Sequence, residues 1–379
     1  MGIAVVGALL FDMLLLSRGF VVSFREILDS VGFDVRVTAT ESPPMMGPPI
    51  RGAEAIAAVV RALPEVREVV PLRAGRAEAL SKDGSTLHIS LFGSGPRQGH
   101  DWTVIEGMTL TPSSDEGGLP VIVNRRLANH LALVPGSELR LAGACTPGPS
   151  AFPAVDLTVQ GIVVFPFDSM VELTAMTTLP GFLRVCGGEE ADAADMLLVA
   201  SQPGTGADAA VEAIQRARPD LHVFSNEQLL DTLQRTDFSY FRQISFVLSS
   251  ITLFFAFLLV TTLLTVSVNQ RFGELAVLRA LGIRRWRIVA SLVCESALLV
   301  GIGGFLALPI GGLLALRLDG ILRTMPDLPE RLHFFVFEPR TILLHLALIA
   351  VTGLLAALYP AYLAARLPIA ATLRREVVS

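Results

Sequence analysis

Two uninterrupted apolar segments, separated by a short arginine-rich segment, constrain the fold of this chain more than any other feature. Residues 244–268 contain no charged side chain, and residues 288–316 contain a single acid, Glu295. About 20 apolar residues in an α-helix cover the roughly 30 Å hydrocarbon core of a bilayer. Both segments are therefore predicted to cross a membrane as helices.

The segment that joins these two spans, residues 269–287, carries five arginines and one acid. Short arginine-rich loops stay on the cytoplasmic side, so this loop is predicted to face the cytoplasm. Phe272, Leu275 and Leu278 recur at helical spacing and predict a short amphipathic helix, which Gly282 would end. Two interpretations stay open: the apolar ridge inserts into a groove of another protein, or it only touches lipid head groups.

Two further spans complete the predicted membrane part. Residues 340–360 form the last span, and residues 1–17 form a first span that is short for a bilayer and looks truncated. A signal peptide is the alternative for this first segment, but it has no basic leader and no small-x-small cleavage site. With arginines following the last span, four spans would place both ends of the chain inside.

The charge distribution divides the chain into two parts. Residues 1–240 contain 17 basic and 28 acidic residues, whereas residues 241–379 contain 13 basic and 7 acidic residues. An acidic first part and a basic second part are typical of a chain divided between the outside and the inner face of a membrane. The acidity argues against nucleic acid as a partner, because phosphate contacts need a basic patch.

Residues 18–243 contain no further span and are predicted to form an α/β domain outside the membrane, entered and left by helical stalks. The pattern predicts strands at 33–40, 66–80, 86–92 and 221–224, and helices at 52–63, 125–133, 207–217 and 228–240. Residues 95–188 are rich in strands and in Gly and Pro turns, and are predicted to be a β-rich subdomain inserted into this domain. Residues 319–338 are predicted to be an outer loop.

The third span contains small residues and an acid with predicted contacts. Gly301, Gly304 and Gly311 allow helices to approach closely in lipid, so this face is predicted to pack against a neighbour. Glu295 lies about 10 Å into the span. It either makes an intramembrane polar contact that changes between conformations, or it bonds nearby arginines (Arg285, Arg287) or water at the interface.

Motifs for catalysis are missing. The single lysine, Lys82, is followed by Asp83, so the chain has no Walker A loop. It also lacks a His-Glu-x-x-His motif and a Gly-x-Ser-x-Gly elbow, which argues against a zinc site and a nucleophilic serine. No catalytic residue, metal or cofactor is predicted. Cys145 and Cys186 both fall outside the membrane and can form a disulfide in an oxidising compartment.

Three stretches resemble FtsX/MacB-type permeases of ABC transporters. Residues 269–287, NQRFGELAVLRALGIRRWR, resemble the coupling-helix signature of that family, and residues 359–376, YPAYLAARLPIAATLRRE, resemble its terminal motif. Residues 121–140, VIVNRRLANHLALVPGSELR, are similar to the MacB-like periplasmic core domain. The resemblance covers nearly the whole chain, and the lipoprotein-release (LolC/LolE) type is the most similar. The basic helix that usually precedes the first span in this family is missing here.

The resemblance implies a multi-pass permease of the inner membrane that pairs with a second permease, identical or different, among membrane lipids. Each permease would dock on a separate ABC ATP-binding subunit that binds the ATP, and the stalks would carry its movement outward by mechanotransmission. The docking positions would be Phe272, Glu274, Leu275, Leu278 and Arg279, with Gly282 as the turn. Export or lipoprotein release is the implied function, with a lipoprotein or periplasmic partner. The alternative is a regulator that activates a cell-wall hydrolase by the same mechanism.

Overall fold

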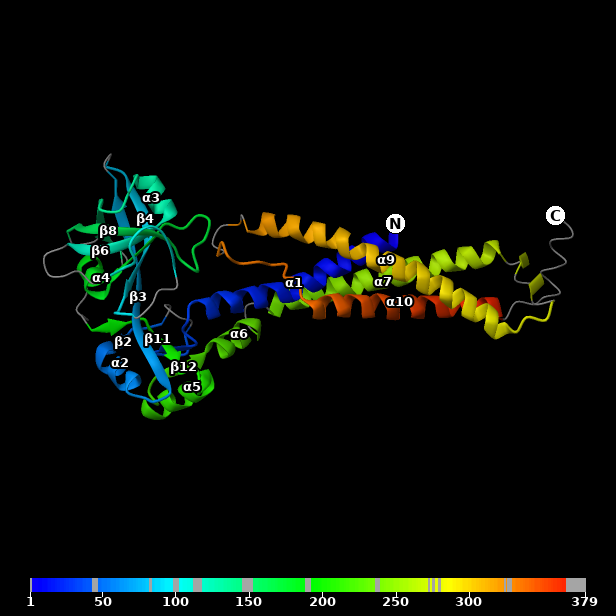
Figure 1. The fold of residues 1–379 in the computed structure, drawn as a ribbon, viewed down its shortest axis with the longest axis horizontal. Helices are drawn as coiled ribbons and strands as arrows, with labels where there is room; N and C mark the ends of the chain where they lie inside the picture. The colour runs from blue at the N-terminus through cyan, green and yellow to red at the C-terminus, as the bar shows by residue number, and fades with distance from the viewer. Residues whose placement is uncertain are drawn as a thin grey trace. The chain divides into compact units, whose positions relative to one another are not determined.

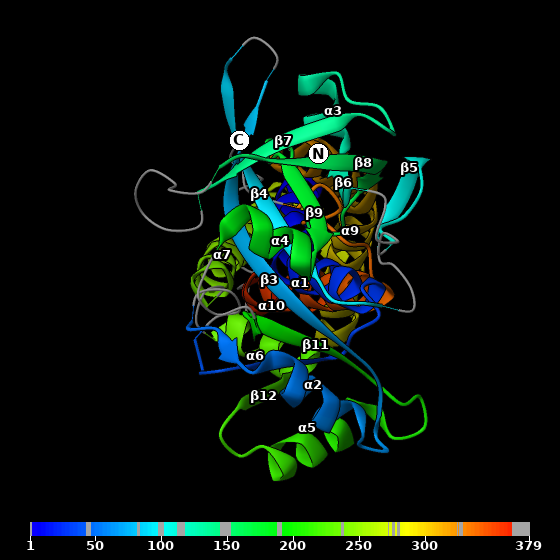
Figure 2. The same cartoon turned by 90° about the vertical axis from the view of Figure 1, so that its left-hand side faces the viewer.

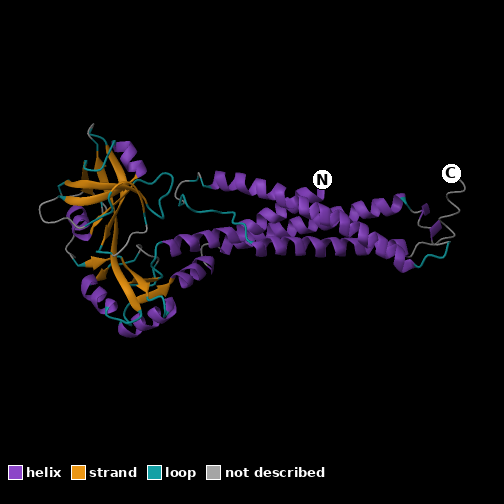
Figure 3. Cartoon of the chain, in the orientation of Figure 1, coloured by secondary structure: helices purple, strands orange, loops and turns teal. Residues whose placement is uncertain are grey.

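The computed structural model divides into two compact units (Figure 1). Unit 1 consists of residues 1–22, 235–322 and 333–379, and unit 2 consists of residues 23–234 and 323–332. Figure 3 shows that unit 1 is helical and that unit 2 contains the strands. The structure describes residues 2–42, 47–81, 84–97, 102–111, 118–144, 153–187, 192–235, 239–271, 273–274, 277–278, 281–323, 325 and 329–365.

Unit 1 is a bundle of four apolar helices, each long enough to cross a bilayer. They are the first part of α1 (Gly2–Ser30), α7 (Ser239–Gln270), α9 (Arg285–Leu322) and α10 (Pro339–Ala365). Leu10, Val260, Val300 and Ile349, one from each helix, meet in one buried cluster. The four predicted spans are thus confirmed as membrane-length helices, although each helix extends beyond its predicted span.

Glycines of α9 bring the helices of unit 1 into close contact. A Cβ added at Gly303 would lie 2.6 Å from Ile3 Cγ2, and one added at Gly311 would lie 3.1 Å from the Ala8 carbonyl oxygen, so both face α1. A Cβ at Gly304 would lie 3.1 Å from Ile349 of α10. An added Cβ at Gly301 would meet no atom within 4 Å. The contact predicted for Gly301 therefore stays a prediction about a neighbour outside this chain.

Unit 2 is built on a ten-stranded mixed sheet with the order β12-β1-β11-β3-β4-β9-β6-β8-β5, in which β7 also pairs with β3 and β8. The strands are β1 (Val35–Thr38), β3 (Val66–Leu80), β4 (Thr86–Ser94), β5 (Thr103–Gly107), β6 (Leu119–Asn124), β7 (Glu138–Gly143), β8 (Val155–Val164), β9 (Thr174–Thr178), β11 (Met196–Ser201) and β12 (His222–Ser225). A separate pair is formed by β2 (Ile50–Arg51) and β10 (Ala193–Ala194).

Unit 2 has two lobes that share strand β3. The first half of β3 pairs with β11 and its second half pairs with β4 and β7. In the α/β lobe, α2 (Ala53–Arg61) and α5 (Gly206–Ala217) lie at one end of β3 (Figure 2). In the β-rich lobe, α3 (Arg125–Leu131) and α4 (Leu179–Cys186) accompany the remaining strands. Each lobe has its own buried core.

The described boundaries differ from the predicted ones in three places. The β-rich region predicted at 95–188 has its own core, but it extends the same sheet rather than forming a separate one. The predicted helix 228–240 corresponds to α6 (Asn226–Arg235) and the start of α7, with residues 236–238 outside the described part. Residues 323–332 of the predicted outer loop belong to unit 2. Cys186 is disulfide-bonded, whereas Cys145 lies outside the described residues.

Replacing Gly303 tests the packing of α9 against α1. Gly303→Val should destabilise unit 1 by about 1–3 kcal/mol, because the new side chain would overlap Ile3. The matched control is Gly301→Val, which enters open space. The measurement is the midpoint of unfolding of the full chain in mixed micelles of dodecyl maltoside and sodium dodecyl sulfate. Equal midpoints for the two variants would contradict the described packing.

Candidate functional site

The loop between α7 and α9 contains a helical turn with a defined end. Residues 273–274 and 277–278 are helical. The amide of Leu281 donates to the carbonyl of Val277 (3.0 Å), and the amide of Ile283 donates to the carbonyl of Leu278 (3.2 Å). Gly282 lies between them at φ +89°, a conformation that costs glycine little. The first is an ordinary helical bond, and the second is the outer, six-residue bond of a Schellman-type helix end with Gly282 at the left-handed position. The helical turn therefore ends at Gly282, where the sequence predicts a helix stop.

Large apolar side chains are exposed in this loop and in the first turn of α9. Leu278 is exposed, and so are Val277, Leu281 and Trp286, the last two at 76% each. Glu274 is also exposed. The other predicted docking residues, Phe272, Leu275 and Arg279, lie outside the described residues. Sequence reasoning missed Val277 and Leu281, although their i, i+4 spacing places them on one face of a helix. The docking role of the loop stays a prediction.

Glu295 fixes the base of this loop. Its carboxylate lies 3.7 Å from the Arg271 guanidinium and accepts a hydrogen bond from the Ser267 hydroxyl at 3.5 Å. Ser267 belongs to α7 and Arg271 follows its last residue, so the contact joins α9 to the end of α7. The partner is thus Arg271 rather than the predicted Arg285 or Arg287. A movement of the loop relative to α9 would have to break this ion pair.

The two stalks, which are the last part of α1 and helix α6, are bonded to each other where they enter the α/β lobe. We call this contact region the stalk junction. Helix α1 ends before Gly32, which adopts φ +77°, and α6 begins at Asn226. The Asn226 amide donates to the carbonyl of Asp34 (2.8 Å), and its side-chain Nδ2 donates to the carbonyl of Phe33 (3.1 Å). Between the helices themselves, Arg25 of α1 lies 3.6 Å from Glu227 of α6.

The centre of this stalk junction is a buried charge. The Arg36 guanidinium on β1 donates to the side-chain oxygen of Asn226, and both residues are buried. Burial lowers the pKa of Arg36 to about 10, while the nearby Asp34 and Asp29 oppose this shift. Arg36 is therefore still charged at neutral pH. Since a buried charge is costly unless it is hydrogen-bonded, Asn226 stabilises the junction.

Substitution of Asn226 tests the stalk junction. Asn226→Leu should lower the stability of the α/β lobe by about 2–4 kcal/mol, because Arg36 would lose its acceptor. Asn226→Asp keeps that acceptor and should cost less. The measurement is amide hydrogen exchange of peptides covering β1 and β12 in the full chain in lipid nanodiscs. If both variants exchange at the same rate, Arg36 does not depend on Asn226.

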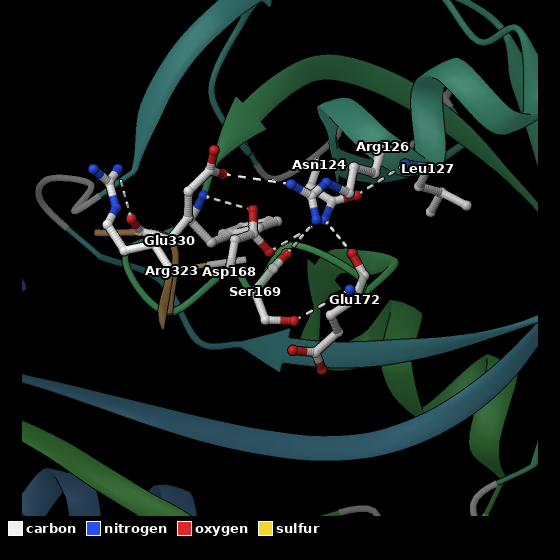
Figure 4. Close-up of polar contacts among 9 residues, drawn as sticks. Asn124, Arg126, Leu127, Asp168, Ser169, Glu172, Arg323 and Glu330 are labelled. Carbon is white, nitrogen blue, oxygen red and sulfur yellow. Dashed lines mark hydrogen bonds and ion pairs between the residues drawn. The ribbon is translucent and has the colours of Figure 1, made fainter. Parts of the chain in front are cut away.

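A second polar cluster organises the β-rich lobe (Figure 4). The side-chain oxygen of Asn124 caps α3 by accepting from the amide of Leu127 at 3.0 Å. Its Nδ2 donates to Asp168 Oδ1 (3.2 Å) and to the carbonyl of Glu172 (2.9 Å). Arg126, the second residue of α3, donates to the carbonyl of Ser169 (2.6 Å). Helix α3 therefore holds residues 165–172, the loop between β8 and β9.

Asp168 is the titratable group of this cluster. Burial raises the pKa of its carboxyl to about 6, and the charge of Glu172 adds to this, although hydrogen bonds from the Phe165 amide, Thr174 and Asn124 lower the pKa in part. The ordinary value is 3.8. The folded state therefore binds a proton on Asp168 more tightly than the unfolded chain does. This contribution to stability is fully present below about pH 4 and is lost as the pH rises through about 6.

The β-rich lobe should consequently become less stable as the pH rises from about 4 to about 7. A pKa difference of about two units corresponds to at most about 3 kcal/mol. Hydrogen exchange of β8 and β9 in the full chain, corrected for intrinsic rates, measures this change. Asp168→Asn cannot ionise and should remove the pH dependence, whatever its effect on absolute stability. A pH dependence that persists unchanged in Asp168→Asn would mean that another group carries it.

The same geometry offers no metal site: the described part of the chain holds no group of three or more His, Cys, Asp or Glu that could bind a metal ion. Instead it contains three groups of polar contacts, which we call joints. They lie at the loop between α7 and α9, at the stalk junction and in the β-rich lobe. These joints connect helices to one another and to the sheet.

Comparison with known proteins identifies both parts of the chain. Residues 1–217 match the model of the MacB-like periplasmic core domain, and residues 246–369 match the model of the FtsX-like permease C-terminal region. None of the curated proteins matches the chain.

Two solved structures are similar to part of the chain. The periplasmic region of MacB from Actinobacillus actinomycetemcomitans is 12% identical, with a TM-score of 0.42 over 56% of this chain and 99% of that one. The extracellular domain of the ABC-type transporter YknZ from Gram-positive bacteria is 13% identical, with a TM-score of 0.37 over 51% of this chain and 98% of that one.

Proposed function

The chain belongs to the family of FtsX-like permeases with a MacB-like periplasmic core domain, and from this premise we propose that it works by mechanotransmission. It is an ABC-transporter-type permease of the inner membrane, with multiple spans and a large periplasmic domain. In the proposed mechanism, a separate ATP-binding subunit docks on the loop between α7 and α9. The helices then carry its movement to the periplasmic domain.

The contacts of residues 323–332 support the side of the membrane assigned to this loop. These residues follow α9, yet they belong to unit 2 together with residues 23–234. The chain therefore crosses the membrane twice, through α7 and α9, and returns to the side on which it started. The loop between α7 and α9 lies on the opposite side, which is the cytoplasm. This agrees with its arginines.

The observation that carries the proposal is that four large apolar side chains in this loop and the first turn of α9 are exposed: Val277, Leu278, Leu281 and Trp286, together called the apolar cluster. Exposed apolar side chains at a helical turn that ends at Gly282, in a loop held at its base by Glu295, are suited to a groove on a partner protein. A lipid contact would not need a fixed shape. For the cargo we propose a lipoprotein or another periplasmic substrate, since the large periplasmic domain suits export better than activation of a hydrolase.

The docking proposal predicts the effect of a charge in the apolar cluster. Leu278→Asp should weaken association with the ATP-binding subunit at least roughly tenfold, because it would bury an unpaired carboxylate at the interface. The measurement is co-purification of the two subunits from membranes in detergent, with quantification of both chains. Val134→Asp, an exposed position in unit 2, is the matched control and should leave association unchanged.

Three outcomes are informative. If Leu278→Asp retains the ATP-binding subunit, the apolar cluster is not the docking surface. If the wild-type chain co-purifies with a lipoprotein, the proposed cargo gains support. Co-purification with a cell-wall hydrolase in its place would overturn the cargo proposal and favour the regulatory function.

A further inference from the structure

Residues 329–332, which we call the strap, are attached to the β-rich lobe at three places. Pro329 pairs with Ser169 in an antiparallel β-bridge, and the Glu330 amide donates to the carbonyl of Asp168 at 2.7 Å. The Glu330 carboxylate lies 3.7 Å from the Arg126 guanidinium, on helix α3. The strap therefore adds a short strand-like segment to the loop between β8 and β9 (Figure 4).

Two further contacts hold the middle of the strap, at Glu330 and Arg331. The Arg331 guanidinium donates to the hydroxyl of Thr103, the first residue of the edge strand β5, at 3.0 Å. Arg323 donates to the carbonyl of Glu330 at 3.2 Å, so the segment leaving α9 is bonded to the strap as well. Leu332, its last residue, is only 1% exposed. Main-chain, ionic and apolar contacts thus act together on one short segment.

The residues directly after the strap are held by the membrane bundle instead. Asp319 of α9 accepts from the amide of Phe334 at 2.7 Å and lies 2.9 Å from the ring of His333. Leu332 and His333 are consecutive, and their Cα atoms are about 3.8 Å apart. One side of this peptide bond is fastened to unit 2 and the other side to unit 1, so no slack separates the two attachments.

From this arrangement we propose that the strap is a third mechanical connection, which makes the β-rich lobe follow α9 and α10 while the stalks act on the α/β lobe. The proposal rests on the proposed function only in that ATP would drive the movement. The stalks enter unit 2 beside β1 and β12, whereas the strap contacts residues around β5, β8 and α3. Since these strands lie toward opposite ends of the sheet, the two connections can change the angle between the lobes.

Adding slack at the junction tests the proposal without replacing any residue that makes a contact. An insertion of Gly-Gly-Ser between Leu332 and His333 lengthens the connection by up to about 10 Å when extended. Spin labels on cysteines at Glu138 of β7 and Leu316 of α9, both exposed, report the distance between lobe and helix. The labelled chain carries Cys294→Ser and is measured in lipid nanodiscs by double electron–electron resonance, with no ATP-binding subunit present.

The insertion should broaden the distance distribution by several ångströms, up to the roughly 10 Å that it adds. The matched control places the same insertion between Gly204 and Thr205, in an exposed turn of the α/β lobe, and should leave the distribution unchanged. A distribution that stays narrow after the insertion at Leu332 would overturn the proposal, because the stalks alone would then hold the lobe.

Arg126→Glu gives a second, independent measurement. It places a like charge next to Glu330, and hydrogen exchange of the Glu330 amide should rise toward the rate of an unprotected amide. The double variant Arg126→Glu with Glu330→Arg should recover part of the protection. Equal exchange in wild type and Arg126→Glu would show that the ion pair does not hold the strap. Neither measurement involves the ATP-binding subunit, so a failure here is distinct from a failure of the proposed function.

Discussion

The bilayer imposes the constraint on which this structure depends. In hydrocarbon a backbone must satisfy its own hydrogen bonds, so an open chain crosses only as helices. These helices are stiff, and α1 runs without a break from unit 1 into the first residues of unit 2. A chain that uses energy from the cytoplasm on the periplasmic side can pass it along these helices. In the proposed mechanism, the contacts at the helix ends then decide how this movement is passed on.

The joints differ in strength, and their burial explains the difference. At the stalk junction Arg36 and Asn226 are both buried, so breaking their contact would leave a buried charge without its hydrogen-bond acceptor. The strap combines a backbone hydrogen bond, typically worth about 1 kcal/mol, with an ion pair between partly exposed side chains, typically worth up to about 1 kcal/mol. Such a sum is comparable to common coupling free energies of about 1–3 kcal/mol. The contacts of the stalk junction are therefore suited to stay formed during a movement, whereas those of the strap are weak enough to break and form again.

Local patterns predicted much of the fold and little of the joints. Hydropathy located the four spans, and the apolar pattern located β3 at its described ends. Helix α4 was missed, although Thr178 at its N-cap and a proline in its first turn are helix-start signals. The strap joins residue 329 to residue 169, and no local pattern in one sequence reports such a pairing. Among the candidate site residues, Gly282 was predictable because a helix stop is a local property.

The position of Asp168 decides whether the strap can transmit a movement to the β-rich lobe. The strap is bonded to the loop that contains Asp168, and a flexible loop would absorb the movement. Loops between strands are usually the most compliant part of a sheet. Here Asp168 accepts from the Phe165 amide within the loop and from Asn124, which also caps α3. These hydrogen bonds take the place of the backbone hydrogen bonds between strands that a loop lacks. The loop should therefore move together with α3 and the core strand β6. A pull on the strap is therefore delivered to the core of the β-rich lobe.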